Sequence, residues 1–309
     1  MKKNYFLAAL LSFAMISMNA QFTDDMESYT DGQPISGAWW TDWGCGGGVG
    51  CAIISSSAQA HDGSLSGVIG GDGTTDAVLD MGNKIFGQWG LDMWVYIPAG
   101  KTGYYNYQGT VPIGAGEWIV GNLFFNDGDF NNGPGTGYID YSCADQSAHV
   151  YYDYPEDTWF RIVTNVDISL GIGAATWQLN IDGVDVAPEG TPFADCALTY
   201  PTSLGGLDLW SNSPDQEMYF DSFVYQDSFI TLGNNDIEAK GFRSAMSNGT
   251  LTLRAQENIN SVAIYNMLGQ QVYNSNVNSM NSTIDMSNMA NGTYIVKVNI
   301  NGTEGSVKV

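Results

Sequence analysis

The aromatic residues of this 309-residue chain have the types and spacing that best fit a binding site. All nine tryptophans and thirteen of the seventeen tyrosines lie between residues 21 and 232. Aromatic faces beside carboxylates and amides stack against sugar rings and hydrogen-bond them. Neighbours in a strand point to opposite faces, so one of each adjacent aromatic pair should face solvent. We therefore expect five residues to bind carbohydrate, with ordinary core packing as the alternative for each: Trp39, Trp40, Trp43, Tyr105 and Tyr152.

The acidic residues indicate a second kind of site, for calcium, which takes six to eight oxygen ligands. One candidate joins the two ends of the acidic region through Asp25, Glu27 and Asp221. The other is the loop 126–133, whose D-x-D-x-N spacing is similar to a calcium loop. In that loop a glycine falls one place late and no glutamate follows at the twelfth position, so a solvated hairpin turn is the alternative. Calcium is the cofactor that these patterns predict.

The sequence patterns that would indicate a catalytic site are weaker than those that indicate binding. A retaining glycosidase needs two carboxylates about 5 Å apart, and the E-x-D-x-E motif that places them on one strand face is absent. The nearest stretches, 137–141 and 207–210, contain one acid each, and a pair drawn from distant strands is left open. The two histidines, His61 and His149, lie in no triad context, and no G-x-S-x-G motif occurs. We therefore expect a protein that is not an enzyme.

Four cysteines occur, namely Cys45, Cys51, Cys143 and Cys196. An even number in an exported chain favours two disulfides. The first two flank a glycine-rich loop that a local bridge closes easily, which leaves Cys143 to pair with Cys196. Zinc binding is the alternative, but there is no C-x-x-C pair and no nearby histidine.

Charge divides the chain into three segments. The whole chain has 33 acidic residues, 10 basic residues and a net charge of −23, which excludes the basic patch that a nucleic-acid binder needs. Residues 1–20 contain two lysines and no acid, residues 21–232 are strongly acidic, and residues 233–309 are balanced. Such shifts mark domain boundaries. We expect a signal peptide at 1–20, a domain at 21–232, a linker at 233–237 and a second domain at 238–309.

The first segment has the pattern of a secretory signal peptide. Lys2 and Lys3 precede an apolar run from Tyr5 to Met18, and Ala20 supplies a small residue before the cleavage point. The run is short of the roughly 20 residues that span a bilayer, so a membrane anchor is the weaker interpretation. No other stretch is long enough, and we expect no transmembrane span in the mature protein.

The second segment has the alternation of an all-β protein. The clearest example is Gln88–Ile97, which places Trp89, Leu91, Met93 and Val95 on one face. Further strands are predicted at 118–125, 150–154, 159–166, 176–181, 204–209 and 218–225, with Trp89, Trp118, Trp159 and Trp177 expected in the core. Roughly a dozen strands in this length suit a jelly-roll-like sandwich of two packed sheets.

Several motifs of this segment resemble concanavalin A-like and laminin G-like domains. They are D-T-W-F-R at 157–161, T-W-Q-L-N-I-D-G-V at 176–184, the opening run 22–29, the run 60–66 and the closing run 218–223. The resemblance covers most of residues 22–230 and implies a lectin-like fold more firmly than a function.

The third segment carries the most specific pattern. It contains V-A-I-Y-N-M-L-G-Q-Q-V at 262–272, I-D-M-S at 284–287, G-T-Y-I-V-K-V at 292–298 and a terminal K-V. This segment resembles the type A C-terminal sorting domain of the type IX secretion system of Gram-negative bacteria. Short alternating runs and Asn-Gly turns predict a small β-sandwich of about six or seven strands. The resemblance implies contact with the secretion machinery, and release from the cell or attachment to its outer surface.

Taken together, the sequence predicts an exported, non-catalytic protein that binds a polysaccharide or surface glycan. A cell-surface adhesin or structural protein with the same fold is the first alternative. A polysaccharide-degrading enzyme with dispersed carboxylates is the second. The net charge of residues 21–232 favours neutral sugars or cations as ligands over polyanions.

Overall fold

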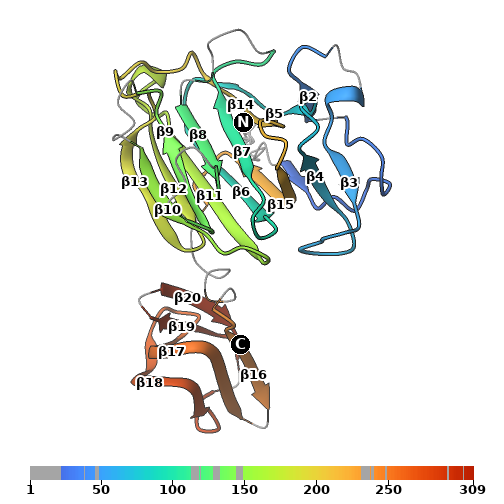
Figure 1. Cartoon of the computed structure of the whole chain (residues 1–309). Helices are drawn as coiled ribbons and strands as arrows, with labels where there is room; N and C mark the ends of the chain where they lie inside the picture. The colour runs from blue at the N-terminus through green and yellow to red at the C-terminus, as the bar shows by residue number, and fades with distance from the viewer. Residues whose placement is uncertain are drawn as a thin grey trace, which may run out of the picture.

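The computed structural model describes residues 22–37, 39–45, 49–112, 118, 120–127, 133–143, 149–230, 237, 240–247, 249–290, 292–301 and 303–309. The expected signal peptide, most of the expected linker and residues 128–132 of the second calcium candidate lie outside these ranges. Two units are described below, the sandwich (residues 22–230) and the tail (residues 237–309), which Figure 1 shows as separate bodies of strands.

The sandwich contains fifteen strands and two short 3-10 turns among its described residues. The strands are β1 (Phe22–Asp24), β2 (Trp40–Asp42), β3 (Ile54–Ser56), β4 (Ser66–Gly70), β5 (Asp76–Lys84), β6 (Gln88–Tyr96), β7 (Gly103–Gln108), β8 (Val120–Phe125), β9 (Thr136–Asp140), β10 (Val150–Asp153), β11 (Trp159–Asp167), β12 (Thr176–Ile181), β13 (Val184–Pro192), β14 (Leu204–Trp210) and β15 (Glu217–Gln226). The turns are η1 (Val49–Cys51) and η3 (Ile172–Ala174). All seven strands that alternation predicted are present.

These strands form two antiparallel sheets. The eight-stranded sheet has the order β13-β12-β11-β6-β15-β4-β3, with β1 pairing with β15. The seven-stranded sheet has the order β10-β9-β8-β7-β14-β5-β2. Because β5, β7 and β14 are neighbours, residues near positions 76, 106 and 208 meet on one sheet. The expected all-β sandwich is confirmed.

The core lies between the sheets and is rich in aromatic side chains. Tyr105 and Tyr107 of β7 are fully buried there, against Phe125 and Trp177. The Tyr107 hydroxyl donates to Thr164 Oγ1 at 2.7 Å, which satisfies its polar end inside the core. Since alternate residues point to opposite faces, β7 must present Tyr104, Asn106 and Gln108 on the outer face of its sheet.

The tail is a five-stranded antiparallel sheet with its own hydrophobic core. Its strands are β16 (Arg243–Ser247), β17 (Thr250–Asn266), β18 (Gln271–Asp285), β19 (Tyr294–Ile300) and β20 (Thr303–Lys308). The register of β17 shifts between Arg254 and Ile259, where its partner changes from β16 to β19. Two predicted runs therefore merge into one long strand, and five described strands replace the six or seven expected. Ile237, which we assigned to the linker, is buried in the tail core.

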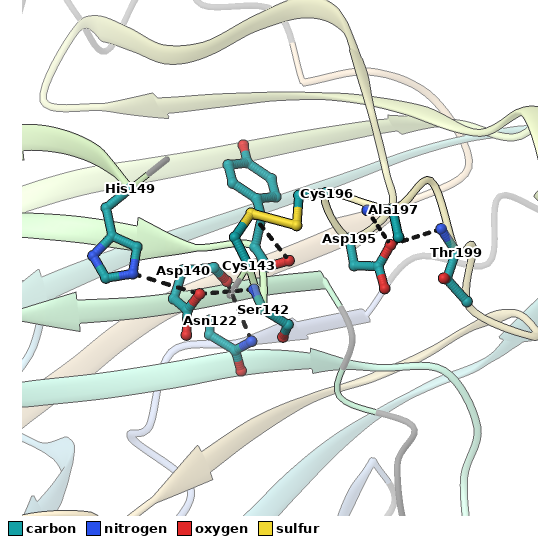
Figure 2. The surroundings of a disulfide bond; sticks show 10 residues. Asn122, Asp140, Ser142, Cys143, His149, Asp195, Cys196, Ala197 and Thr199 are labelled. Carbon is teal, nitrogen blue, oxygen red and sulfur yellow. Dashed lines mark hydrogen bonds and ion pairs between the residues drawn. A yellow bond between two sulfur atoms is a disulfide. The ribbon is translucent and has the colours of Figure 1, made fainter. Parts of the chain in front are cut away.

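Two disulfides link the predicted cysteines. Cys45 bonds to Cys51, with their Cα atoms 6.3 Å apart, and Cys143 bonds to Cys196 at 5.6 Å. Figure 2 shows that the second bridge ties the chain after β9 to the turn at Asp195. The Asp195 carboxylate accepts the N–H groups of Ala197 and Thr199 and so holds that turn. The expected pairing is confirmed, and the zinc alternative is excluded.

Candidate functional site

A pocket of about 320 Å³ opens on the outer face of the seven-stranded sheet. This volume lies at the lower end of the range for small-molecule sites. The lining side chains are three tryptophans, one tyrosine and three polar residues: Trp43, Trp118, Trp210, Tyr104, Asp76, Asn106 and Asp208. The described lining residues thus include two acids and no Lys, Arg or His.

Strand pairing brings these side chains together. Trp210 of β14 lies directly opposite Asp76 of β5, and Asp208 lies opposite Asn106 of β7. Leu207 and Leu209 point into the core, so Asp208 and Trp210 must point outward. Trp43 and Trp118 come from the segments after β2 and before β8, and their ring centroids are 5.1 Å apart. The first bridge, at Cys45, lies two residues beyond Trp43 and restrains the loop that carries it.

The two carboxyls of the pocket lie close together and are poorly satisfied. Asp208 is only 2% exposed, and within the described chain neither its Oδ1 nor Asp76 Oδ1 accepts a hydrogen bond from an N–H or O–H group. Burial raises the pKa of Asp76 to about 6, and the nearby charge of Asp42 adds to the rise. Burial also raises the pKa of Asp208 well above its ordinary value, and the charge of Asp76 adds to that. A proton shared between the two carboxyls satisfies both.

A chain of hydrogen bonds holds the other oxygen of Asp208. Asp208 Oδ2 accepts from Asn106 Nδ2 at 2.8 Å and from Gln108 Nε2 at 3.2 Å. Asn106 also donates to the Tyr104 hydroxyl, which in turn donates to Asn122 Oδ1 at 3.0 Å. Asn122 donates to the Asp140 carbonyl beside the second disulfide, as Figure 2 shows. The pocket floor is therefore anchored across β14, β7, β8 and β9.

Of the five residues expected to bind carbohydrate, only Trp43 lines this pocket. Tyr105 and Tyr152 are buried in the core, and Trp40 is buried with its indole N–H donating to Asp24 at 2.9 Å. Trp39 is 37% exposed but packs on Phe22, away from the pocket lining. These placements correct the expectation that the three buried rings face solvent. Of the adjacent residues Tyr104 and Tyr105, the prediction chose Tyr105 as the ring that faces outward. The structure places Tyr104 on the outer face instead.

The other six lining residues were missed as site residues, among them the tryptophans Trp118 and Trp210. Trp118 was expected in the core but is 39% exposed, since it precedes β8 and lies outside the alternating strand. Trp210 ends β14, next but one to Asp208, where the sequence shows an acid and an aromatic on the same strand face. The pair Asp208 and Trp210 could therefore have indicated the site from the sequence. Asp76, the second acid of the pocket, lies more than a hundred residues away in the chain and could not be linked to them. Neither histidine is among the lining residues.

The acidic side chains of the first calcium candidate accept hydrogen bonds from backbone N–H groups. Glu27 accepts the N–H groups of Ser64 and Leu65 at 2.8 and 2.7 Å, and Asp221 accepts those of His61, Asp62 and Ser222. Asp25 is exposed and accepts the N–H of Glu27. Among the described residues no three His, Cys, Asp or Glu side chains are arranged to hold a metal. Asp25, Glu27 and Asp221 are therefore not grouped as metal ligands in the described chain, and calcium binding stays a prediction.

Comparison with protein families identifies the tail. Residues 247–309 match the family described as the secretion system C-terminal sorting domain. The match begins inside β16, so the structural unit extends upstream of it to include Ile237 and Phe242 of the tail core. The protein carries a type IX sorting domain and is secreted or attached to the outer-membrane surface. No helix of the described part of the chain has the length and apolarity needed to cross a membrane.

Distant similarities to the chain are found among solved structures, whereas no curated protein matches the chain. A botulinum neurotoxin serotype G binding domain shares 9% identity over 84% of this chain and 72% of its own, with a TM-score of 0.36. The catalytic domain of a glycoside hydrolase family 131 protein from Coprinopsis cinerea shares 13% identity, with coverages of 67% and 94% and a TM-score of 0.39. A structure described under endo-acting O-glycanases of the human gut microbiota shares 16% identity, with coverages of 68% and 99% and a TM-score of 0.40. At these values none of them bears on the ligand or activity of this chain.

Proposed function

We propose that the exported protein binds a carbohydrate in the tryptophan-lined pocket of its sandwich. The observation that supports this function is the convergence of three partly exposed indoles on a polar floor of two carboxyls and an amide. Indole faces stack on the apolar faces of sugar rings, while carboxyls and amides hydrogen-bond sugar hydroxyls. The floor is pre-organised by its own hydrogen bonds, so little ordering cost accompanies binding.

Two tryptophan variants of the full chain test this function. Trp210 is 42% exposed in the pocket, and Trp39 is 37% exposed outside it. We expect a glycan screen to detect binding by the wild-type protein and by Trp39→Ala. Trp210→Ala should weaken binding about tenfold, because a stacked ring contributes about 1 kcal/mol beyond its buried area. Equal losses in the two variants, or no glycan bound by the wild type, would contradict the proposal.

Glycoside hydrolysis is a second candidate, and the facing carboxyls favour it. Hydrolases of this kind need one protonated and one ionised carboxyl, which a pair with a shared proton supplies. Retaining enzymes hold the two groups about 5 Å apart, whereas Asp76 and Asp208 are close enough to share a hydrogen bond. The two groups are thus closer than the retaining arrangement requires, and this difference favours binding over hydrolysis. Release of reducing ends by the wild type but not by Asp208→Asn would reverse the ranking.

An adhesive role is the third candidate. Ile85, Phe86 and Leu170 are exposed apolar side chains on two loops, which the hydrogen bond from Ile168 N–H to the Gly87 carbonyl joins. An exposed apolar patch of this kind is typical of protein contact sites. If adhesion to a protein partner is the function, substitution of Phe86 by Ser should abolish it while Trp210→Ala leaves it unchanged.

A further inference from the structure

The acid pair of the pocket stands apart from the other buried acids of the sandwich. Asp92 is also buried, and its two oxygens accept from Arg161 Nε at 2.8 Å and Nη2 at 2.7 Å. Buried carboxylates are ordinarily paired in this way or saturated with donors, because an uncompensated charge is costly in a low-dielectric environment. Asp76 and Asp208 instead face each other, and the charge of Asp42 acts on Asp76 as well. The pocket therefore holds acidic oxygens for which the described lining residues supply no cation.

The rest of the lining suits a positive charge. An ammonium group has three N–H donors and no acceptor, which matches a pair of acceptor oxygens that lack donors. Indole faces attract cations within about 6 Å of the ring centroid, and tryptophan is the strongest of the aromatic side chains in this respect. Trp43, Trp118 and Trp210 line the same pocket as the two acids. An anionic sugar would meet repulsion from both acids, and a neutral sugar would leave their charge uncompensated.

We propose that the pocket selects a sugar that carries a protonated primary amine, with the ammonium group seated between Asp76 and Asp208 and the ring stacked on the tryptophans. This inference rests on the proposed carbohydrate-binding function and names its ligand class. A sugar whose amine is acetylated loses the charge and one or more donors, and the bulkier group must then occupy the buried end of the pocket. Selection between free and acetylated amines is thus the property that distinguishes this ligand class.

Binding of an ammonium group should displace the proton that the empty pair shares. Among the described residues, the titratable groups that act on the pair are Asp42, which raises the pKa of Asp76, and Tyr104, whose own pKa is raised by burial and by Asp208. At pH 5 the pair is protonated and competes with the ligand, whereas at pH 7 Asp76 has passed its pKa of about 6. Affinity for the amine should therefore rise between pH 5 and pH 7, with net proton release on binding.

Calorimetric titration of the full chain with three matched β-1,4 tetramers tests the inference. The tetramers are those of glucosamine, N-acetylglucosamine and glucose, which differ only at the C2 substituent. We expect the glucosamine tetramer to bind at least tenfold more tightly than the other two at pH 7. Asp208→Asn should remove that preference, and the exposed Asp215→Asn should keep it. Nα-acetyl-lysine methylamide, an amine without a sugar, should bind at least tenfold more weakly than the glucosamine tetramer.

Three outcomes would overturn the inference. They are equal binding of the three tetramers, an unchanged preference in Asp208→Asn, and no binding of the glucosamine tetramer. The proposed function fails separately, when no glycan of any class binds in the screen. Tight binding of a neutral glycan that Trp210→Ala weakens would keep the proposed function and reject the amine.

Discussion

Two groups of acidic residues in the sandwich show opposite chemistry. The chain-end cluster, Asp24, Glu27 and Asp221, has its carboxylates saturated by donors from neighbouring loops. In the pocket pair, Asp76 and Asp208, one oxygen of each acid receives no hydrogen bond from any other residue of the described chain. The first group stabilises the fold by holding β1, β15 and the 61–65 loop together. The second is the group to which the proposed function assigns the ligand, and the supply of donors, rather than the density of acid, is what differs between the two groups.

The largest expected effect comes from the chain-end cluster. Asp24 accepts from the Tyr29 hydroxyl at 2.7 Å, from Trp40 Nε1 at 2.9 Å and from Met26 N–H at 3.0 Å. Asp24→Ala leaves three donors unpaired and should lower the free energy of unfolding by about 3 kcal/mol. Asp25→Ala, at an exposed neighbour, should change it by less than about 0.5 kcal/mol. Urea unfolding followed by tryptophan fluorescence measures the stability of both variants, because all the tryptophans lie in the sandwich. Similar losses in the two variants would contradict the structural role given to Asp24.

A smaller effect of opposite sign is expected at the pocket pair. The folded protein raises the pKa of Asp208, so it keeps a proton that the unfolded chain loses near pH 4. Stability from this group is therefore present at low pH and is lost as the pH rises through the folded-state pKa. Asp208→Asn keeps an acceptor for Asn106 and should raise the melting temperature at pH 8 by about 2–4 °C. At pH 4 the variant and the wild type should melt within about 1 °C of each other, and a variant less stable than wild type at pH 8 would show that the pair is structural.

The smallest effect is expected from calcium. Because backbone N–H groups occupy Glu27 and Asp221, an added ion gains few free oxygen ligands at the chain ends. The melting temperature should differ by less than about 1 °C between 5 mM calcium and a chelator, since ligand stabilisation scales with affinity for the folded state. A rise of several degrees that Asp25→Ala removes would confirm the predicted metal site.

Local sequence patterns predicted most of the strands of the fold. Period-2 alternation identifies β6, β11 and β12 nearly to the residue, and the Asn-Gly turns and terminal motifs identify the tail. By contrast β5 and β7 were not predicted, since Asp76 and Asp80 interrupt the apolar pattern of β5 and β7 is buried on both faces. The pocket depends on those two strands together with β14. Its residues come from positions 43 to 210, and only the pairing of distant strands brings them together.

The choice of aromatic residues failed for a related reason. Alternation shows that Tyr104 and Tyr105 face opposite ways but does not say which sheet face lies against the core. That depends on where the second sheet packs, which places Tyr105 against Phe125 and leaves Tyr104 beside Trp210. The disulfides were predicted because loop length and cysteine number are local properties of the sequence.

The most direct test of the central claim is a crystal structure of the protein bound to its tightest glycan from the screen. The account predicts a sugar ring in van der Waals contact with the Trp210 indole and a polar group of that sugar within hydrogen-bond distance of Asp208. A glycan bound elsewhere, for example over Ile85, Phe86 and Leu170, with an unchanged Asp76–Asp208 pair, would contradict it.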